Sequence, residues 1–279
     1  MTLLVTGSAG FIGSCFVRQH FEHSIEPVVS LDALTYAGHL STLGPVLKRP
    51  EHTFVHASIG DVNAVRTIFE QHKPRAVLNF AAESHVDRSI HGPGDFIETN
   101  IVGTFRLLES VRGYWQSLEA NAQSQFRFLH VSTDEVYGSI PEGSWDEECP
   151  LLPNSPYSAS KASSDLLVRS YARTHKLNAV TTRCSNNYGP YQFPEKVIPL
   201  FVSNLIDGKN VPLYGEGNNV RDWLHVDDHC DGIHRVLEGG RAGEIYNIGG
   251  GTELTNKELT GLLLEACGAD WDRVDRVED

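Results

Sequence analysis

The chain has 279 residues, is 40% hydrophobic, and carries 23 Lys and Arg residues against 36 Asp and Glu residues, a formal net charge of −13. A chain of this length can bury a full core and still build a second, smaller lobe. The acidic balance excludes a nucleic acid or an anionic membrane as the general partner, because either needs a basic face. A phosphorylated substrate would require a local positive pocket.

Five cysteines are spread along the chain, and no two of them form a Cys-x-x-Cys pair. This spacing predicts neither a disulfide framework nor a zinc site and is typical of a reducing compartment. The first apolar run reaches Thr6 and Gly7 too early for a signal-peptide core, and no run approaches the ~20 apolar residues that span a bilayer. We therefore expect a cytoplasmic protein without a membrane segment.

Short apolar runs alternate with longer helical stretches over most of the chain. Residues 61–71, 96–112 and 158–175 carry apolar residues at three- and four-residue spacing, the pattern of helices packed on a parallel sheet. The alternation predicts an α/β fold built on a doubly wound parallel sheet of the Rossmann type. The runs that read as strands buried on both faces are 3–6, 27–31, 53–56, 76–80, 127–131, 179–182 and 244–248.

The regular alternation stops after residue 187. Residues 188–219 are rich in Pro and Gly, with one helical stretch around 199–206. The chain then returns toward the sheet and leaves it again for a helix over 257–266. We expect a sheet domain of residues 1–187 joined by 220–249, and a smaller, interleaved C-terminal lobe of residues 188–219 and 250–279 that binds the substrate.

A glycine-rich loop, GSAGFIG over residues 7–13, follows the first expected strand and opens a helix. Glycine lets the backbone approach a pyrophosphate, whose charge is stabilised at the helix N-terminus. A tight turn without a ligand would also use glycine. The next strand, however, leads to Asp32, where a carboxylate can bond a ribose 2′-hydroxyl and repel a 2′-phosphate. Together these features predict a dinucleotide site that prefers NAD to NADP.

Tyr157 and Lys161 lie four residues apart at the head of an expected helix and therefore on one face. A protonated Lys beside a phenol favours the phenolate, which makes Tyr157 a usable base, and can also bond a nicotinamide ribose. Without a cofactor loop, the same spacing would more simply describe a Tyr packed under a solvated Lys. With the loop present, the pair indicates hydride chemistry.

The fifth expected strand leads into STDEVYG over residues 132–138. The carboxyl ends of strands in a doubly wound sheet line the ligand crevice, so Thr133, Asp134 and Glu135 should face the nicotinamide. A simple dehydrogenase needs a hydroxyl such as that of Thr133 to hold the substrate oxygen. It does not need two adjacent carboxyl groups such as those of Asp134 and Glu135. An Asp-Glu pair is more often part of a solvated turn, yet its place at a strand end near Tyr157 favours a catalytic function.

At these residues the sequence resembles the extended short-chain dehydrogenases/reductases and, within them, the dTDP-glucose 4,6-dehydratases. The resemblance spans almost the whole chain. GSAGFIG and YSASK are shared by many relatives, whereas TDE over 133–135 together with FPEK over 193–196 is far more selective. The remaining matching segments are AAESHVDRS over 81–89, RCSNNYGPY over 183–191 and RDWLHV over 221–226.

The resemblance implies a three-stage reaction in which NAD returns to its starting state. Tyr157 would remove the glucose 4-hydroxyl proton while hydride leaves C4, with Thr133 bonding that oxygen and Lys161 tuning the phenol. Glu135 would then take the C5 proton and Asp134 would protonate the departing 6-hydroxyl. Hydride would return to C6. The implied product is dTDP-4-keto-6-deoxyglucose, a precursor of deoxysugars such as rhamnose.

The resemblance also carries binding positions onto this sequence. Lys196 and Arg221 would provide the local positive charge that an acidic chain needs for a diphosphate, although either alone is as readily ordinary surface charge. The cofactor positions are Gly7, Gly10, Phe11, Ile12, Gly13, Asp32, Ala33, Leu34, Thr35, Ser58, Ile59, Phe80, Ala81, Ala82, Ser84, Thr99, Tyr157, Lys161 and Asn187. The substrate positions are Ser84, Thr133, Asn186, Glu195, Lys196, Val197, Pro212, Leu213, Tyr214, Arg221 and Asn256.

Two features depart from the family pattern. Ser58 precedes Ile59 where the family usually has an Asp, so a charged acceptor for the adenine is lost. The sequence ends at Asp279, whereas the family usually continues through a segment that covers the nucleotide diphosphate. We therefore expect either that the substrate lobe is incomplete at its C-terminal end or that it closes in a different way.

Several alternatives share part of this pattern. A UDP-glucose 4,6-dehydratase would use the same residues, because no motif distinguishes thymidine from uridine. A sugar-nucleotide 4-epimerase or decarboxylase would use Tyr157, Lys161 and NAD, but neither needs an acid such as Asp134 to expel the 6-hydroxyl. A non-catalytic NAD-binding scaffold would have no reason to retain the whole catalytic set.

Two further expectations concern a metal and a partner. His225 and His229 are four apart, a spacing that could bind a metal on a helix. We instead expect Asp227 or Asp228 to cap a helix through 230–237, with His225 in a preceding strand, and we predict no catalytic metal.

In relatives, the helices corresponding to 96–112 and 158–175 form a homodimer contact, and the resemblance implies the same here.

Overall fold

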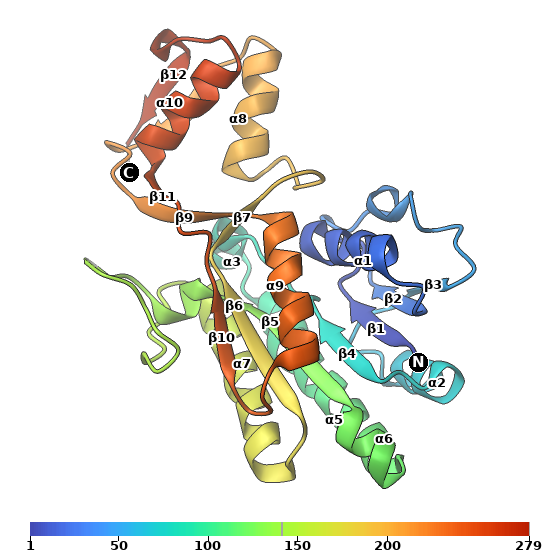
Figure 1. Cartoon of the computed structure of the whole chain (residues 1–279). Coiled ribbons are helices and arrows are strands. Elements are labelled where there is room, and N and C mark those ends of the chain that lie inside the picture. Colours follow the sequence, from blue (N-terminus) through green and yellow to red (C-terminus); the bar gives the residue numbers. More distant parts are fainter. Residues whose placement is uncertain (141, 279) are drawn as a thin grey trace. The chain divides into compact units, whose positions relative to one another are not determined.

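The computed structural model describes residues 1–140 and 142–278. The chain divides into two compact units (Figure 1). Unit 1 comprises Met1–Cys184 and Cys230–Ile248, and unit 2 comprises Ser185–His229 and Gly249–Asp279. The two units are therefore interleaved in sequence.

Unit 1 is built on one seven-stranded sheet with the strand order β10-β6-β5-β4-β1-β2-β3. All its neighbouring strands run parallel. The apolar runs expected to be strands are all present, which confirms the doubly wound α/β fold. The strands are β1 (Leu3–Thr6), β2 (Val28–Asp32), β3 (His52–His56), β4 (Ala76–Asn79), β5 (Arg127–Thr133), β6 (Ala179–Cys184) and β10 (Ile245–Ile248).

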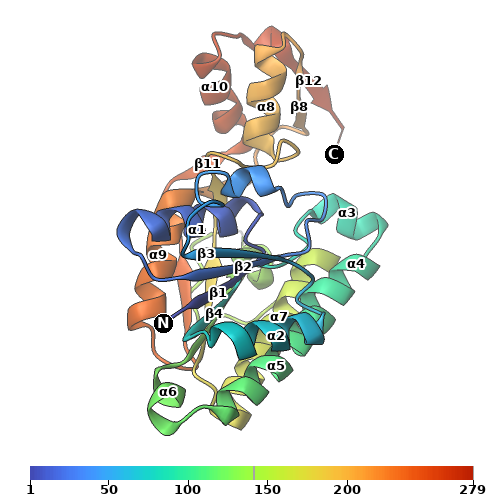
Figure 2. The same ribbon diagram turned by 90° about the vertical axis from the view of Figure 1, so that its right-hand side faces the viewer.

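Helices cover both faces of this sheet. In Figure 2, α2 (Val62–His72), α5 (Thr104–Ser117) and α7 (Pro156–His175) lie on one side of the strands, and α1 (Phe11–His23) lies on the other. The apolar faces of α2, α5 and α7 pack with the sheet in one buried cluster that includes Leu107 and Phe128. The shorter segments are η1 (Leu40–Leu43), α3 (Val86–His91), α4 (Gly94–Phe96), the π-helix η2 (Ile97–Gly103), α6 (Ala120–Gln125) and the 3-10 turn η3 (Asp134–Tyr137).

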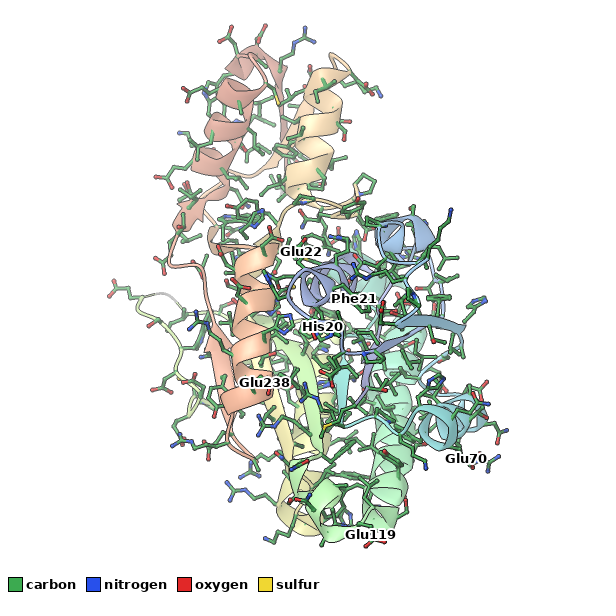
Figure 3. The ribbon with its side chains drawn as sticks, turned by 45° about the vertical axis from the view of Figure 1, so that its right-hand side comes forward. His20, Phe21, Glu22, Glu70, Glu119 and Glu238 are labelled. Atoms are coloured by element: carbon green, nitrogen blue, oxygen red, sulfur yellow. The ribbon has the colours of Figure 1, made fainter. Side chains whose placement is uncertain are left out.

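On the opposite face, α1 packs against α9 (Val226–Gly239) through aromatic rings. The His234 ring stacks on Phe16 at a centroid distance of 4.2 Å and lies 6.0 Å from His20. Glu238, also on α9, accepts a 3.0 Å hydrogen bond from Arg75. Figure 3 labels His20 on α1 and Glu238 on α9. Burial lowers the pKa of His234 to about 4, so this ring packs as a neutral aromatic group.

Helix α7 begins with a complete capping box. The Ser155 hydroxyl accepts the backbone N–H of Ser158, and the Ser158 hydroxyl accepts the backbone N–H of Ser155, each at 3.0 Å. Pro156 occupies the first helical position, where its missing N–H costs no hydrogen bond. The cap fixes the first turn of α7, the turn that carries Tyr157.

Unit 2 has two small sheets and a core of its own. β11 (Glu253–Thr255), β9 (Val220–His225) and β7 (Asn186–Tyr188) form one sheet, and β12 (Val274–Val277) pairs with β8 (Val211–Tyr214) in the other. Its core contains Phe201 and Leu205 from α8 (Val197–Ile206), Val211, and Leu264 from α10 (Asn256–Ala266). A short 3-10 turn, η4 (Trp271–Arg273), precedes β12.

One segment differs from the sequence expectation in its placement. The sequence predicts that residues 220–229 join the large sheet, but β9 pairs with β7 and β11 and lies in unit 2. The helix that follows begins at Val226, so Asp227 and Asp228 lie in its first turn and are not its cap. The cap prediction was wrong: the backbone N–H of Asp227 donates to Nδ1 of His225 at 3.3 Å.

Among the described residues, no helix has the length and apolarity to cross a bilayer.

Candidate active site

The glycine-rich loop lies where β1 meets β4, the point at which the strand order reverses. Gly7 has φ 63°, and a Cβ there would come within 2.6 Å of the Ala81 backbone nitrogen. The loop is closed by a 3.2 Å bond from the Gly10 N–H to the Gly7 carbonyl, and α1 begins at Phe11. Only glycine fits at Gly7, and the loop leads directly into the N-terminus of α1, an arrangement that suits a pyrophosphate.

Asp32, at the end of β2, is fixed on the same loop. One carboxylate oxygen accepts the Ala9 N–H and the other accepts the Leu34 N–H, both at 2.8 Å. Burial raises the pKa of Asp32, although these two backbone bonds oppose the rise. A carboxylate offers about four acceptor positions, so the two bonds leave capacity for a ribose hydroxyl.

The other expected cofactor positions of unit 1 follow the carboxyl ends of neighbouring strands. Leu34 adopts φ 49°, which turns the chain after β2. Ser58, in the position where the family has Asp, uses its hydroxyl to accept the Gly60 N–H at 3.1 Å. Thr99 lies within the π-helix η2, a rare wide turn that often marks a functional site. The remaining positions are Phe11 and Ile12 in α1, Ala33 and Thr35 after β2, Ile59 after β3, and Phe80, Ala81, Ala82 and Ser84 after β4.

Tyr157 and Lys161 both lie on the buried side of α7. The backbone N–H of Tyr157 donates to the Ser89 hydroxyl at 3.1 Å, and the Lys161 ammonium donates to the Val131 carbonyl at 2.8 Å. The Lys161 side chain therefore reaches from α7 to β5, one strand residue before Ser132. The two residues thus share one face of α7, as their spacing predicts. Their catalytic role stays a prediction.

Thr133 connects this helix with the two carboxyl groups. Its hydroxyl donates to Asp134 Oδ1 and accepts the backbone N–H of Glu135, each at 3.3 Å. The same hydroxyl is hydrogen-bonded to the Tyr157 phenol. The turn η3 is closed at Gly138, whose φ of 88° and contact with the Leu152 carbonyl leave no room for a Cβ. The structure thus brings the expected catalytic side chains into one cluster.

The electrostatics of this cluster differ from the simple sequence argument. Burial raises the pKa of Tyr157 well above its usual range. The groups Glu135, Cys184 and Asp134 add to the rise, and the hydrogen bond to Thr133 opposes it. Burial therefore outweighs the lowering of the Tyr157 pKa that its spacing from Lys161 predicts.

Some positioning residues give no sequence signal. The buried amide of Asn100 accepts the Glu83 N–H at 2.9 Å and donates to the Glu83 carbonyl at 2.9 Å and to the Ser160 hydroxyl at 2.8 Å. It therefore holds the segment after β4 against α7. A single Asn in a largely apolar helical stretch reads as incidental, and only the fold shows what it contacts.

The expected cofactor position Asn187 and all expected substrate positions other than Ser84 and Thr133 belong to unit 2. The side-chain Oδ1 of Asn187 lies 2.8 Å from His229 Nδ1, and the side-chain Nδ2 of Asn187 donates to the Ser185 backbone carbonyl at 3.0 Å. Arg221 is exposed and donates to the Val220 carbonyl at 2.9 Å. The others are Asn186 in β7, Glu195 and Lys196 before α8, Val197 at its start, Pro212, Leu213 and Tyr214 in β8, and Asn256 at the start of α10.

His225 and His229 do not share a helix face. His225 ends β9 and His229 lies in α9, where burial lowers its pKa to about 3. Over residues 1–140 and 142–278, no group of three or more His, Cys, Asp or Glu side chains is arranged to hold a metal ion.

Known proteins resemble this chain over nearly its whole length. Residues 4–278 match a family model described as GDP-mannose 4,6 dehydratase. A dTDP-glucose 4,6-dehydratase from Streptomyces antibioticus is 57% identical over 285 residues, covering 100% of this chain and 81% of that protein. This chain belongs to the dTDP-glucose 4,6-dehydratase family. A second family member, dTDP-glucose 4,6-dehydratase 1 of Escherichia coli K12, is 53% identical over 269 residues, covering 93% of this chain and 74% of that protein.

Solved structures of dTDP-glucose 4,6-dehydratases share the fold. The enzyme from Streptomyces venezuelae, solved with NAD bound, matches with a TM-score of 0.93 and 56% identity over 100% of this chain and 85% of that one. A UDP-glucose 4-epimerase from Thermotoga maritima matches with a TM-score of 0.87 but only 31% identity, over 100% of this chain and 85% of that one. The fold is therefore common to both activities, and the side chains at the site must distinguish them.

Proposed function

We propose that this protein is an NAD-dependent hydro-lyase that converts dTDP-glucose to dTDP-4-keto-6-deoxyglucose and water. The observation that carries the proposal is the contact of Thr133 with both Asp134 and Tyr157 at the end of β5. An oxidation site and an acid–base pair share one hydroxyl, as a combined oxidation and elimination requires. The dTDP-glucose 4,6-dehydratases at 57% and 53% identity support this choice of substrate.

The residues of unit 1 fit NAD. Gly7 leaves room for a close phosphate, and Asp32 offers a carboxylate to a ribose hydroxyl. Bound NAD would accept hydride from the sugar and later return it. The Asp32 carboxylate can accept a ribose 2′-hydroxyl and would repel a 2′-phosphate, which supports NAD rather than NADP.

In the first stage, Tyr157 takes the proton of the sugar 4-hydroxyl as C4 is oxidised. Lys161, held against the Val131 carbonyl, directs its positive charge toward this region, and Thr133 bonds the reacting oxygen. The pKa of Tyr157 is raised by burial, so the phenol becomes a base only when positive charge gathers beside it.

In the second stage, the 4-ketone acidifies the C5 hydrogen and the carboxyl groups act in opposite senses. Glu135 removes the C5 proton, and Asp134 protonates the departing 6-hydroxyl, so that water leaves. In the third stage C6 is reduced and Glu135 returns its proton to C5. Adjacent carboxyl groups can hold opposite protonation states because ionisation of one disfavours ionisation of the other.

The cycle leaves one proton on Tyr157 and one missing from Asp134. Thr133 is hydrogen-bonded to both side chains, so its hydroxyl offers a direct route for returning that proton. No proton then needs to be exchanged with solvent to complete a turnover.

We also propose that unit 2 binds the nucleotide end of the substrate through Lys196, Arg221 and Asn256. The guanidinium of Arg221 is exposed and suits a diphosphate.

A cytoplasmic homodimer is part of the same proposal. Three large apolar side chains support it, because Ile97, Phe105 and Leu166 are 50%, 45% and 55% exposed on the helices expected to form the contact.

The proposal is tested by incubating the purified protein with NAD and either dTDP-glucose or UDP-glucose. We expect loss of one water from dTDP-glucose by mass spectrometry and a 4-keto chromophore in base. Faster dehydration of UDP-glucose would reassign the base. A product of unchanged mass but altered C4 configuration would indicate an epimerase, and no reaction with either sugar would contradict the proposal.

A further inference from the structure

Helix α7 presents a third ionisable residue on the face that carries Tyr157 and Lys161. Asp165 lies one turn beyond Lys161, as Lys161 lies one turn beyond Tyr157. Lys161 is 4% exposed and Asp165 is 3% exposed. A carboxyl group this deeply buried is costly unless it is paired, and the proposed reaction gives it no step.

Asp165 is paired mainly with Arg183, which comes from the neighbouring strand β6. Arg183 Nε donates to Asp165 Oδ2 at 2.9 Å, and His130 Nε2 lies 3.6 Å from Oδ1. The amide nitrogen of Asn79, a donor, lies 3.2 Å from His130 Nδ1, so Nε2 carries the imidazole proton. Burial lowers the pKa of His130 well below its usual range, which leaves this ring neutral.

Arg183 is itself held by the turn that carries the catalytic carboxyl groups. Its Nη1 donates to the Tyr137 hydroxyl at 2.8 Å, and its guanidinium lies 4.7 Å from the centre of the Tyr137 ring. The Tyr137 hydroxyl in turn donates to Asn247 Oδ1 at 2.8 Å. Tyr137 is the last residue of η3, so the ion pair is anchored on three elements of unit 1: α7, β6 and η3.

The groups facing Lys161 leave Asp165 as its main counter-charge. On β5 it meets the Val131 carbonyl and the neutral His130, and on β6 the thiol of Cys184, whose pKa burial raises to about 12. On its own helix it has the phenol of Tyr157 and the carboxylate of Asp165. Burial lowers the pKa of Lys161, and the charge of Asp165 opposes that fall.

We propose that Asp165 and Arg183 are positioning residues: Arg183 keeps Asp165 ionised, and Asp165 keeps Lys161 protonated inside a buried site. Burial raises the pKa of Asp165, and Arg183 is the largest influence that opposes the rise. In a medium of low effective dielectric, this charge stabilises an ammonium more than it would in water. The inference rests on the proposed function only where Lys161 supports proton removal by Tyr157.

The direct test measures the protonation of Lys161 itself. Competitive acetylation of the NAD-bound protein with acetic anhydride over a pH series, followed by peptide mass spectrometry, reports where each amine loses its proton. In Asp165→Asn we expect Lys161 to become reactive at lower pH than in the wild type. Asp165→Glu keeps the charge and is the matched control, which we expect to restore the wild-type profile. This readout does not depend on any sugar substrate.

Turnover provides the second readout. We expect the alkaline limb of kcat to move to lower pH in Asp165→Asn, with activity at about pH 9 falling several-fold relative to that at about pH 7. Arg183→Gln should move the limb the same way, because an unpaired Asp165 takes up a proton. The double variant should move it no further than Asp165→Asn alone, since Arg183 acts through Asp165.

Asp165→Asn leaves a buried Arg without its partner and could unfold the chain, whereas the double variant removes both charges. Each variant is therefore accepted only if its circular dichroism and NAD binding match the wild type. A folded Asp165→Asn or double variant whose Lys161 labelling and alkaline limb both match the wild type overturns the inference. If labelling shifts but neither sugar reacts in the wild type, the proposed function fails and the inference stands.

Discussion

Thr133 is the residue at which the two kinds of chemistry meet. Its hydroxyl contacts Asp134, the Glu135 backbone and the Tyr157 phenol. The sequence predicts these partners because a strand end and a helix start lie at the same edge of a parallel sheet. It does not predict the raised pKa of Tyr157, which depends on burial by residues distant in sequence.

The residues that the sequence does not reveal are buried polar groups. Asn100 and Asp165 sit in helices whose apolar spacing explains their fold, and a lone polar residue there carries no local signal. Asn100 is hydrogen-bonded to the backbone of Glu83, in the segment after β4, and Asp165 pairs with Arg183 on β6. Such roles depend on which elements the fold brings together, so they can be seen only in three dimensions.

A substitution at Glu135 separates the stages of the reaction. In Glu135→Gln the C5 proton has no base, so we expect C4 oxidation to proceed and elimination to slow by about two to four orders of magnitude. Reduced cofactor should then accumulate, as measured by NADH absorbance after mixing with dTDP-glucose. Tyr157→Phe is the control, because it lacks the base for oxidation and should show no NADH. Normal turnover by Glu135→Gln would remove this residue from the mechanism.

At the scale of elements, strands buried on both faces are the most predictable. β1, β2 and β4 are continuous apolar or small runs because helices cover both sides of the sheet, and their ends agree with the expected ones within one or two residues. The strands of unit 2 are short, and β9 begins with exposed residues, carries Arg221 and Asp222 in its first half, and buries only Trp223 and Leu224. A polar strand of this kind resembles a loop until its partners β7 and β11 are known.

The packing of α1 on α9 predicts a pH-dependent stability. His234 has its pKa lowered from 6.5 to about 4 by burial, so the unfolded chain binds its proton more readily than the folded one. The stabilisation is present above the unfolded value and is lost as pH falls from 6.5 toward 4. In His234→Phe, which keeps a ring against Phe16, we expect this loss to be smaller by about 1 kcal/mol.

Denaturant unfolding at about pH 7.5 and about pH 5.5 measures that difference. The wild type should lose more stability than His234→Phe between the two conditions. His20 keeps part of the dependence in both proteins, because burial lowers its pKa as well. An equal loss in wild type and variant would show that the ring is not held neutral in the folded state.

At the scale of the whole molecule, the interleaved arrangement follows from the break in alternation after residue 187. The sequence predicts the first boundary between the two units after residue 187, close to the observed boundary between Cys184 and Ser185. It assigns residues 220–229 to the large sheet, whereas they lie in unit 2. A strand-like sequence does not indicate which of two sheets the strand joins. The formal net charge of −13 over the entire chain disfavours anionic partners such as nucleic acids, because these need a basic face.

The proposed homodimer makes a prediction about exposed apolar side chains. Replacing Phe105 and Leu166 by Asp would place charges in a contact between helices, so we expect a monomer by sedimentation velocity. Leu262, 51% exposed on α10 of unit 2, is the matched control, and Leu262→Asp should leave the assembly unchanged. A dimer that survives both helix substitutions would place the contact elsewhere, and a wild-type monomer would contradict the proposal.

The central claim is that oxidation, elimination and reduction occur in one site with one cofactor. It is tested most directly with dTDP-glucose carrying deuterium at C4, followed by NMR and mass spectrometry of the product. The account predicts loss of one water and recovery of the deuterium in the C6 methyl group, because the hydride removed from C4 is the one returned to C6. Dehydrated product without deuterium at C6, or deuterium retained at C4, would contradict it.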